Sequence, residues 1–389
     1  MSPAQRPADP TLAAYEEGAD RWIARRPPER RRASAFGRSL RAGGRSVGRV
    51  VDLGCGPGWH LPDLPPGTIA LDGARSMLER VPGHAPGAAR VQADLRALPF
   101  ARHSLGAAWA NKSYVHLDRR DVPLALWDLH RALRVGGTAA LGVFAATRPG
   151  SEEHDHVDAF GDSLPGRRFS FWTGELLDTV VAGAGFTVTR RDEDPIGDDR
   201  QWTLTLQRDR TLADTVGPGM RLLLVGLNPS LYAADAGVGF ARPGNRAWPA
   251  LLASGLATAD RDPLRLLREG GVGMTDLVKR ATARAEEVSP AEFRDGLARL
   301  ERLCAWLRPG AVAVAGLTGW RTATGHRAAS VGWQDRTLGG RPVYLMPNPS
   351  GLNAHTSVDD LAGHLRAAAS GPGDDGPAPH GTAGTGTAP

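Results

Sequence analysis

Short apolar runs alternate with amphipathic segments along most of the chain. "RVVDLG" (49–54) and "SLGAAWAN" (104–111) are runs typical of buried strands. "DVPLALWDLHRAL" (121–133) instead spaces its apolar residues as one face of a helix and is followed by Gly136 and Gly137. Strands that alternate with helices in this way predict an α/β fold.

The same pattern predicts the order of elements in the first half of the chain. We expect strands at 49–54, 67–72, 89–95, 104–111 and 137–144, helices at 74–81, 121–133 and 173–185, and a closing hairpin-like pair of strands at 187–194 and 200–209. The periodicity then pauses over 210–219, a short helix or a connector, before "MRLLLVG" (220–226) opens a second α/β unit.

These patterns divide the chain into four parts. We expect a polar, Arg-rich leader with helical pieces at 1–45, a first α/β domain at 46–208, a second at 209–370, and a tail at 371–389. The tail has too few apolar residues to offset the entropy cost of ordering, so we expect it to be disordered. With 389 residues, the chain is long enough for two domains with separate cores.

Charge adds one open question. The formal net charge is +5 and the isoelectric point about 9.7, which permits a polyanionic partner without requiring one. Residues 21–49 hold ten arginines and a single acid, Glu29. This segment is either a nucleic-acid contact or a solvated helical face with its adjoining loop.

The two cysteines, Cys55 and Cys304, cannot build a disulfide framework, which favours a reducing compartment. The N-terminus lacks an apolar signal core, and no apolar run reaches the ~18 residues that a membrane span needs. We therefore expect a soluble, cytoplasmic protein that makes no membrane contact and, in a bacterium, associates with the nucleoid.

The first candidate site is a glycine-rich loop. In "VVDLGCGPG" three glycines, Gly54, Gly56 and Gly58, follow a strand at alternate positions, where they let the backbone turn and approach a ligand closely. Asp72 ends the next strand, where its carboxylate can accept both ribose hydroxyl protons. Asp94 ends the third strand, where it can accept from an adenine amino group. The G-x-G-x-x-G spacing of NAD-binding loops is absent.

This ordered set, together with "LRVGGTAAL" downstream, resembles the class I S-adenosylmethionine-dependent methyltransferases over residues ~12–207. The resemblance implies a three-layer, Rossmann-like αβα domain with S-adenosyl-L-methionine as its cofactor. It also implies that Asp52 and the loop from Gly54 to Gly58 hold the methionine end, Asp72 the ribose and Asp94 the adenine.

The methyl acceptor remains open. After the fourth strand the chain reads "NKSYVH" (111–116), without the proline pair of amino-group DNA methylases, and neither cysteine follows a proline as in cytosine-ring methylases. The domain therefore resembles neither class of DNA base methylase. Tyr114 and His116 either line an acceptor pocket or are packing residues. A small molecule, RNA, or cofactor binding without turnover all remain possible.

The second unit carries five dispersed signals. They are "GLNPS" (226–230), "GVGFARPGNRAW" (237–248), "GVGMTDLVKRATARAEEVS" (271–289), the buried strand in "AVAVAGLTGW" (311–320) and "VYLMPNPSGLNAHTS" (343–357). In this order they resemble the mismatch-specific uracil/thymine-DNA glycosylases of the uracil-DNA glycosylase superfamily across ~212–369. The resemblance implies a second three-layer αβα domain, with a uracil-DNA-glycosylase-like fold, that needs no cofactor and no metal.

The chemistry of base excision suits these residues. Hydrolysis of a base–sugar bond needs a positioned water and donors for the leaving base. Asn228, fixed by a strand end and by Pro229, can hold that water, and the resemblance makes it the catalytic residue. By the same resemblance Leu227, Phe240 and Asn348 bind the base, with Phe240 stacking on it once it is flipped out. A neutral amide is a weak base, and Asn348 stands where faster uracil glycosylases have a histidine, so we expect slow turnover.

The second motif, "NPSGL", is expected to enter the DNA. Leu352 would fill the hole left by the flipped base, the backbone of Gly351 and Asn353 would bind the orphaned guanine, and Ser350 and His355 would lie against the DNA. The alternatives are that Leu352 is a buried loop residue and that His355 merely precedes a helix. That helix would begin with an N-cap at Ser357 and a capping box completed by Asp360. Ser230 replaces a glycine common in the family's first motif, which leaves the base range open.

We therefore expect a monomeric two-domain enzyme that removes uracil or a related pyrimidine opposite guanine from double-stranded DNA. It should be monofunctional, because the chain has only two lysines, Lys112 and Lys279, and neither is expected under the sugar. Two alternatives remain. Methylation is the main activity and the second unit delivers it to nucleic acid, or the second unit binds DNA damage without catalysis.

Overall fold

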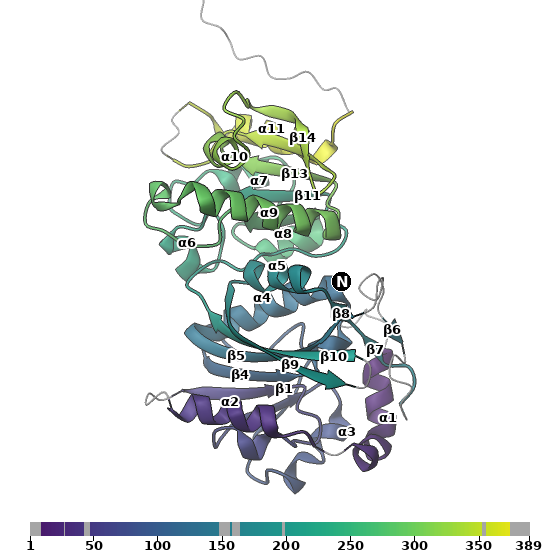
Figure 1. Ribbon diagram of the computed structural model, residues 1–389. Helices are drawn as coiled ribbons and strands as arrows, with labels where there is room; N and C mark the ends of the chain where they lie inside the picture. The colour runs from purple at the N-terminus through teal and green to yellow at the C-terminus, as the bar shows by residue number, and fades with distance from the viewer. Residues whose placement is uncertain are drawn as a thin grey trace, which may run out of the picture.

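The computed structural model describes residues 9–26, 28–42, 47–147, 156–157, 164–196, 199–351 and 355–373. Two main sheets lie in separate parts of the chain (Figure 1). We call the part with strands between Arg49 and Arg208 the N-terminal unit and the part with strands between Leu222 and Met346 the C-terminal unit. Both are α/β, as the pattern predicts.

The sheet of the N-terminal unit has the order β3-β2-β1-β4-β5-β10-β9, with β8 paired to β5. All its pairings are parallel except those that β10 makes with β5 and β9. Its strands are β1 (Arg49–Leu53), β2 (Ile69–Asp72), β3 (Arg90–Gln92), β4 (Leu105–Asn111), β5 (Leu133–Ala145), β8 (Phe171–Trp172), β9 (Phe186–Ile196) and β10 (Asp199–Arg208). The predicted strands and the closing pair are confirmed. The chain reverses its direction of travel across the sheet between β1 and β4, the point where open parallel sheets bind ligands.

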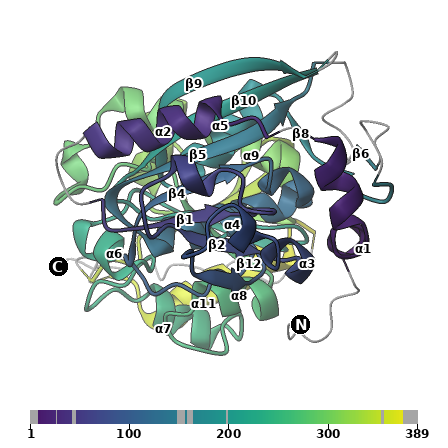
Figure 2. The ribbon, with the colours of Figure 1, turned by 90° about the horizontal axis from the view of Figure 1, so that it is seen from below.

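Helices cover both faces of this sheet, which gives three layers. The helices α4 (Val122–Ala132) and α5 (Gly174–Gly183) pack on one face, and α2 (Arg31–Ala42) packs Phe36 and Leu40 against Trp109 on the other. Two further helices, α1 (Pro10–Arg25) and α3 (Arg75–Leu78), lie beside each other at the carboxyl ends of the strands (Figure 1 and Figure 2). A separate two-stranded sheet joins β6 (His156–Val157) to β7 (Arg168–Phe169).

The C-terminal unit has the sheet order β12-β11-β13-β15-β14, with four parallel strands and an antiparallel edge strand, β14. The strands are β11 (Leu222–Gly226), β12 (Val272–Asp276), β13 (Ala311–Ala315), β14 (Gly332–Leu338) and β15 (Arg341–Met346). The helices are α6 (Leu231–Ala236), α7 (Ala247–Ala253), α8 (Pro263–Gly270), α9 (Pro290–Leu307), α10 (Leu317–Thr324) and α11 (Val358–Ser370). The uncertain stretch 210–219 is a connector without a helix.

Alternation along β11 shows why this unit also has three layers. Leu223 and Val225 belong to a core cluster that includes α9 and α10, whereas Leu222 and Leu224 belong to a cluster with α7 and α11. Because successive side chains of a strand point to opposite faces, an apolar run of this kind requires cover on both sides.

The two units are packed against each other through α5 and α9 (Figure 1). The ring of Trp172 meets that of Trp306 edge to face at 6.0 Å, and Arg302 Nε donates to Thr179 Oγ1 at 2.9 Å. Within the connector, the Asp214 backbone N–H donates to the carbonyl of Gly183, while its side chain faces the C-terminal unit.

The carboxylate of Asp214 is buried and receives three donors. Lys279 Nζ lies at 2.6 Å, Arg299 Nη1 at 2.7 Å and Thr275 Oγ1 at 2.6 Å. Burial opposes the charge, but Arg299 and Lys279 hold the pKa of Asp214 below its ordinary value. A buried carboxylate is tolerated only when it is paired in this way.

The Arg-rich segment is used within the fold. Arg30 pairs with Asp63, and Arg31 and Arg32 pair with Asp194. These arginines attach α2 to the body, so part of the positive charge in this segment is neutralised internally.

Both cysteines are buried and free. Burial raises the pKa of both thiols, that of Cys304 to about 12. In the described part of the chain, no helix combines the length and the apolar character needed to cross a membrane.

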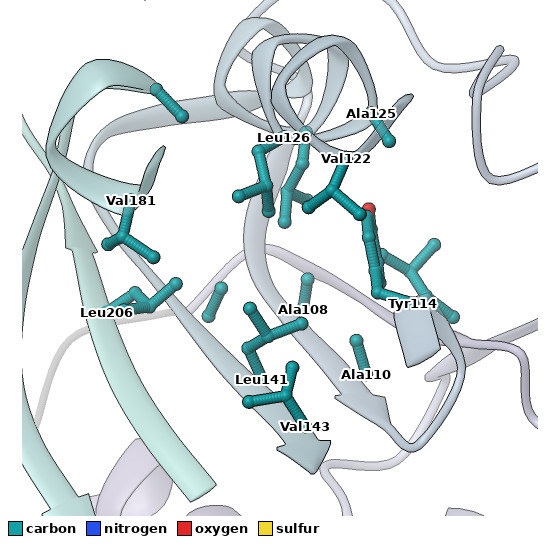
Figure 3. Close-up of a cluster of buried hydrophobic side chains, with 14 of the residues drawn as sticks. Ala108, Ala110, Tyr114, Val122, Ala125, Leu126, Leu141, Val143, Val181 and Leu206 are labelled. Atoms are coloured by element: carbon teal, nitrogen blue, oxygen red, sulfur yellow. The ribbon is translucent and has the colours of Figure 1, made fainter. Parts of the chain in front are cut away.

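Tyr114 is a core residue. It begins a short 3₁₀ helix after β4, and Figure 3 shows its ring among the apolar side chains between β4 and α4. Its hydroxyl is buried without a hydrogen-bond partner in the part of the chain that the structure describes, and burial together with the Asp128 carboxylate raises its pKa. Of the two roles open for Tyr114, the structure favours packing.

A buried hydroxyl without a partner costs about 1–3 kcal/mol, so Tyr114→Phe should raise the free energy of unfolding by about 1 kcal/mol. Tyr344→Phe is the matched control, because the Tyr344 hydroxyl lies 2.8 Å from His364 Nδ1 and its removal should destabilise the protein. Denaturant unfolding of both variants measures the difference. A loss of stability in Tyr114→Phe as large as that in Tyr344→Phe would contradict this assignment.

Candidate active sites

A cavity of about 750 Å³ lies at the carboxyl ends of β1, β2 and β4. The glycine loop forms part of its wall. Gly54 and Gly56 have φ angles of +68° and +54°, and a Cβ on Gly54 would lie 2.3 Å from the Cβ of Ser113. A side chain at position 54 is therefore excluded, and the loop stays open to a ligand that approaches the backbone.

Asp72 organises this loop. Its carboxylate accepts from the backbone N–H of Gly56 and of Ala74, each at 2.8 Å. Burial nevertheless raises its pKa. Asp72 also lines the cavity, so a carboxylate oriented by two backbone donors faces any ligand bound there.

The remaining predicted residues of this site take different positions. Asp94 lines the cavity and forms a bidentate pair with Arg96, with 2.7 Å between its Oδ2 and Nη2. Asp52 lies beneath the loop rather than in the cavity wall, and burial, then Asp72, raises its pKa well above the ordinary value. Gly58 is a packing position, because a Cβ there would lie 3.0 Å from Leu61.

One wall of the cavity comes from α1, which the sequence patterns do not connect with the glycine loop. Trp22 stacks on Trp59 with 4.9 Å between ring centroids, and Tyr15 meets Trp22 edge to face. The Glu16 carboxylate accepts from the backbone N–H groups of Arg75 and Ser76, which attaches α1 to the start of α3. Tyr15 and Trp22, seven residues apart, were the available signal: they place two aromatic rings on one face of an otherwise polar helix.

His116 lies at the same wall in a chain of hydrogen bonds. Its Nδ1 lies 2.8 Å from the carbonyl of Arg168 and must therefore carry the proton. Its Nε2 accepts from the Tyr15 hydroxyl at 2.9 Å, and Arg167 Nη1 donates to that hydroxyl at 2.8 Å. Burial, and secondarily Arg167, lowers the pKa of His116 to about 4, so the ring is neutral. His116, unlike Tyr114, lines the cavity.

The second candidate site lies at the carboxyl edge of the C-terminal sheet. Asn228 follows β11, Asp276 ends β12, Gly316 follows β13 and Asn348 follows β15. The order β12-β11-β13-β15 places Gly316 between the two asparagines. Adjacent strands lie ~4.8 Å apart, so roughly 10 Å separates the ends of β11 and β15. The structure thus brings the predicted residues Asn228 and Asn348 to one edge.

The amide of Asn228 has a defined orientation. Its Nδ2 donates to Thr282 Oγ1 at 2.7 Å and to the carbonyl of Arg280 at 3.1 Å. Because a carbonyl oxygen can only accept, the nitrogen must face this loop. The Oδ1 then faces away, and it has no donor among the described residues. An acceptor held in one direction at a strand end can bind a water.

Phe240 and Asp276 meet beside this amide. Phe240 has a φ of +56°, which is rare for a bulky residue and typical of functional loops. A Cβ on Gly226 would lie 3.3 Å from Phe240 Cζ and 2.4 Å from Asp276 Oδ1, so both side chains face the end of β11. Burial raises the pKa of Asp276 to about 6. Asp276 is a site residue that the sequence did not single out.

Leu227 contributes differently from its neighbours. A Cβ on Gly319 would lie 2.3 Å from Leu227 Cδ1, so its side chain packs against α10. Its carbonyl accepts from the backbone N–H of Val278 at 3.0 Å. Any contact of Leu227 with a base would therefore be made by its backbone N–H. Ser230 caps α6, its hydroxyl accepting from the Ala233 N–H at 3.1 Å.

The second motif forms a loop held from both sides by Arg246. The Arg246 guanidinium donates to the carbonyl of Ser350 at 3.1 Å and to that of Thr356. Asn348 Oδ1 accepts from the Ser350 N–H at 2.9 Å. Gly351 lies against Gly244, where a Cβ would come within 2.7 Å of the Gly244 carbonyl oxygen. Arg246 was not predicted, because its partners are backbone atoms about 100 residues away.

Leu352 and Asn353 lie outside the described residues, so their insertion into DNA stays a prediction. His355 is exposed at the far end of the loop. The capping box is confirmed: Ser357 Oγ accepts from the Asp360 N–H at 3.1 Å, and the Asp360 carboxylate accepts from the Ser357 N–H at 2.9 Å.

Comparison with known families assigns the two units separately. Residues 213–368 match the uracil DNA glycosylase superfamily. Residues 50–137 match the family described as a methyltransferase domain. The chain therefore carries a domain of each kind, with a Rossmann-like methyltransferase fold in the N-terminal unit.

Three similar solved structures are methyltransferases. A SAM-dependent methyltransferase of Methanosarcina mazei is 13% identical, with 44% of this chain and 97% of that chain covered and a TM-score of 0.39. The 1,6-didemethyltoxoflavin-N1-methyltransferase of Burkholderia thailandensis, solved with 1,6-didemethyltoxoflavin and S-adenosylhomocysteine, is 19% identical, with coverages of 51% and 85% and a TM-score of 0.40. The magnesium protoporphyrin IX methyltransferase of Synechocystis, solved with SAH, is 16% identical, with coverages of 51% and 98% and a TM-score of 0.41.

The raised pKa of Asp276 makes stability depend on pH. Its folded-state pKa of about 6 exceeds the ordinary 3.8, so the folded protein binds the proton more tightly than the unfolded chain. Stability should therefore fall as pH rises from about 4 to about 6, by up to ~3 kcal/mol. Asp276→Asn, which cannot ionise, should gain stability relative to the parent over this range.

Denaturant unfolding at pH 4, 6 and 8 measures the difference between Asp276→Asn and the parent. Asp335→Asn, on the exposed side of β14, is the control for loss of one negative charge. A difference that stays constant from pH 4 to pH 8 would show that Asp276 ionises normally.

Proposed function

We propose that this chain, which carries a uracil DNA glycosylase superfamily domain and a methyltransferase domain, removes uracil or a related damaged pyrimidine opposite guanine from double-stranded DNA. We propose that it does so as a monomer. The observation that carries the proposal is the orientation of Asn228: its Nδ2 is bound by Thr282 and Arg280, and its Oδ1 is left as an acceptor at the strand end. Such an acceptor suits the placement of a water beneath a sugar.

In this mechanism each group has a limited role. Asn228 Oδ1 orients the water as the base–sugar bond breaks and positive charge develops on the sugar. Phe240 stacks on the flipped base, and Asn348 lies on the far side of Gly316, about where the base would end. Because a neutral amide accepts a proton poorly, the reaction depends on stabilisation of the leaving base and is slow.

Contacts to the duplex are assigned to the loop that Arg246 holds. Ser350, Gly351 and His355 lie on its described ends. We propose that Leu352 fills the space left by the flipped base and that the backbone of Gly351 and Asn353 binds the unpaired guanine. A loop fixed at both ends can insert its tip without losing the entropy of its whole length.

We further propose that the N-terminal unit binds S-adenosylmethionine, which supplies an electrophilic methyl group when bound. The open glycine loop and the cavity-facing Asp72 support this role. Asp72 would accept from the ribose hydroxyls and Asp94 from the adenine amino group, while Asp52 would support the loop from below. If methylation were the main activity, base excision would be absent while methyl transfer remained. A binder without catalysis would show neither.

Asn228→Ala should abolish excision of uracil from a G:U duplex while affinity for that duplex stays within about tenfold, or ~1.4 kcal/mol. The reason is that one side chain holds the water but makes little of the DNA contact. Thr282→Val, which removes one of the three acceptors that orient the amide, should slow excision only partly. Full excision by Asn228→Ala would exclude Asn228 as the catalytic residue.

The product should be an intact abasic strand that breaks only after alkali or heat. Nicking glycosylases attack the sugar with an amine and form a Schiff base. Lys279 is bound to Asp214 at 2.6 Å, and Lys112 lies in the other unit. Borohydride trapping of parent and Lys279→Ala tests this directly. A covalent DNA adduct that forms with the parent and disappears in the variant would make the enzyme bifunctional.

Cofactor affinity should depend on the first site alone. Asp72→Ala removes charge-assisted hydrogen bonds worth roughly 1.5–3 kcal/mol each, so calorimetry should show at least tenfold weaker S-adenosylmethionine binding. Asn228→Ala is the control and should bind the cofactor as the parent does. Unchanged affinity in Asp72→Ala, or no binding by the parent, would refute the cofactor assignment.

A further inference from the structure

The cavity extends beyond the glycine loop into a part walled by aromatic rings. Trp22 lies next to the loop, its Cζ3 4.0 Å from where a Cβ of Gly56 would be, and it stacks on Trp59. On the same wall, Tyr15 connects Trp22 to His116, and His116 packs on Phe169 with 5.0 Å between ring centroids. Flat apolar walls of this kind favour a flat ligand, which can lie against the rings over its whole face.

The wall formed by α1 is fixed in place beside this part of the cavity. Glu16 binds the backbone of α3, and Thr11 Oγ1 accepts from the Arg168 N–H at 2.9 Å. The helix is thus attached at two places along its length. A cavity of about 750 Å³ must hold the methyl donor together with the reacting part of the acceptor, so the space favours a small acceptor group.

One cation that lines this cavity, Lys112, has no partner among the described residues. Lys112 lines the cavity directly after β4, with a φ of +59° that is costly for a side chain of this size. Its side chain makes no hydrogen bond or ion pair with any residue that the structure describes. Burial, and then Arg26, lowers its pKa, whereas Glu29 and Asp194 act in the opposite sense from a distance. An anion bound beside Lys112 would stabilise its charged form and raise its pKa again.

Tyr15 and His116, which also line this cavity, form a possible path for a proton. The Tyr15 hydroxyl, which accepts from Arg167, donates to His116 Nε2, so a proton received by Tyr15 can be passed to His116 as Tyr15 gives up its own. Arg167 and Arg26 both oppose a positive charge on His116, whose pKa is about 4. Each pKa unit by which the acceptor is less acidic than protonated His116 adds ~1.4 kcal/mol to the free energy of moving the proton from the acceptor to His116. Weakly acidic alcohols, which must lose their proton to react, are therefore poor acceptors here, and acidic hydroxyl or ring N–H groups are suitable.

We propose that the N-terminal unit methylates a small, planar aromatic molecule at an acidic hydroxyl or ring N–H, with Lys112 binding the anionic form and Tyr15 passing the proton to His116. This inference rests on the proposed S-adenosylmethionine site. The acceptor's lone pair forms the bond to the methyl carbon, and the carbon–sulfur bond breaks with its electron pair left on sulfur. The acceptor's proton goes to Tyr15 as the Tyr15 proton goes to His116 Nε2.

Binding is tested first, by calorimetry on the full chain saturated with S-adenosylhomocysteine. The anion of 4-nitrophenol should bind at least tenfold more tightly than nitrobenzene, which has the same ring without the charge. Lys112→Met should abolish this preference, and Trp22→Ala should weaken both ligands. Arg38→Met, on the exposed face of α2, removes one positive charge elsewhere and should leave the preference intact.

Transfer of a labelled methyl group tests the proton route. Across phenols of decreasing acidity, Tyr15→Phe should lose little rate on those already ionised in solution and at least tenfold on those that are not. If the transfer rate falls with increasing phenol pKa equally steeply for the parent and for Tyr15→Phe, Tyr15 does not pass the proton. Failure to bind S-adenosylhomocysteine would refute the cofactor assignment itself. Binding of S-adenosylhomocysteine without either aromatic probe, or methylation of DNA or RNA but not of phenols, would refute the acceptor alone.

Discussion

The buried carboxylate of Asp214 is the interaction on which the placement of the C-terminal site depends. A charge removed from water must be matched by donors, and Asp214 draws in Lys279, Arg299 and Thr275 from three positions of one unit. Its own backbone N–H donates to Gly183 in the other unit. One residue of the connector therefore fixes the segment after β12 and joins it to the N-terminal unit.

The pairing of Asp214 with Lys279 also affects the proposed catalytic amide of Asn228, because Lys279 lies close in sequence to the residues that bind this amide. Lys279 is followed by Arg280 and Thr282, whose carbonyl and hydroxyl receive the amide hydrogens of Asn228. The same pairing that positions this loop takes the lysine out of competition as a nucleophile, because its ammonium is bound to Asp214. The orientation of the Asn228 amide and the pairing of the Lys279 ammonium thus have one physical cause.

Both sites use the carboxyl edge of a parallel sheet, but they differ in what covers it. In the N-terminal unit, α1 covers one side of the edge and forms a wall of a cavity in which burial lowers the pKa of His116 and raises that of Asp72. In the C-terminal unit, the edge carries Asn228, Asp276 and Asn348, and the loop held by Arg246 stands beside it. An edge with a helix over one side suits a small acceptor group, and an edge flanked by a fixed loop suits a base delivered from a duplex.

The sequence by itself determined the strands, the glycine loop, the asparagine at the end of β11 and the capping box of α11. These follow from burial periodicity and from residues close together in the chain, which act over a few positions. Only the tertiary structure decided that α1 walls the first cavity, that His116 faces it while Tyr114 enters the core, that Asp276 lies beside Phe240, and that Lys279 is bound to Asp214. Each of these depends on groups brought together across tens of residues or more, or on small differences in backbone direction. The local sequence pattern determines neither.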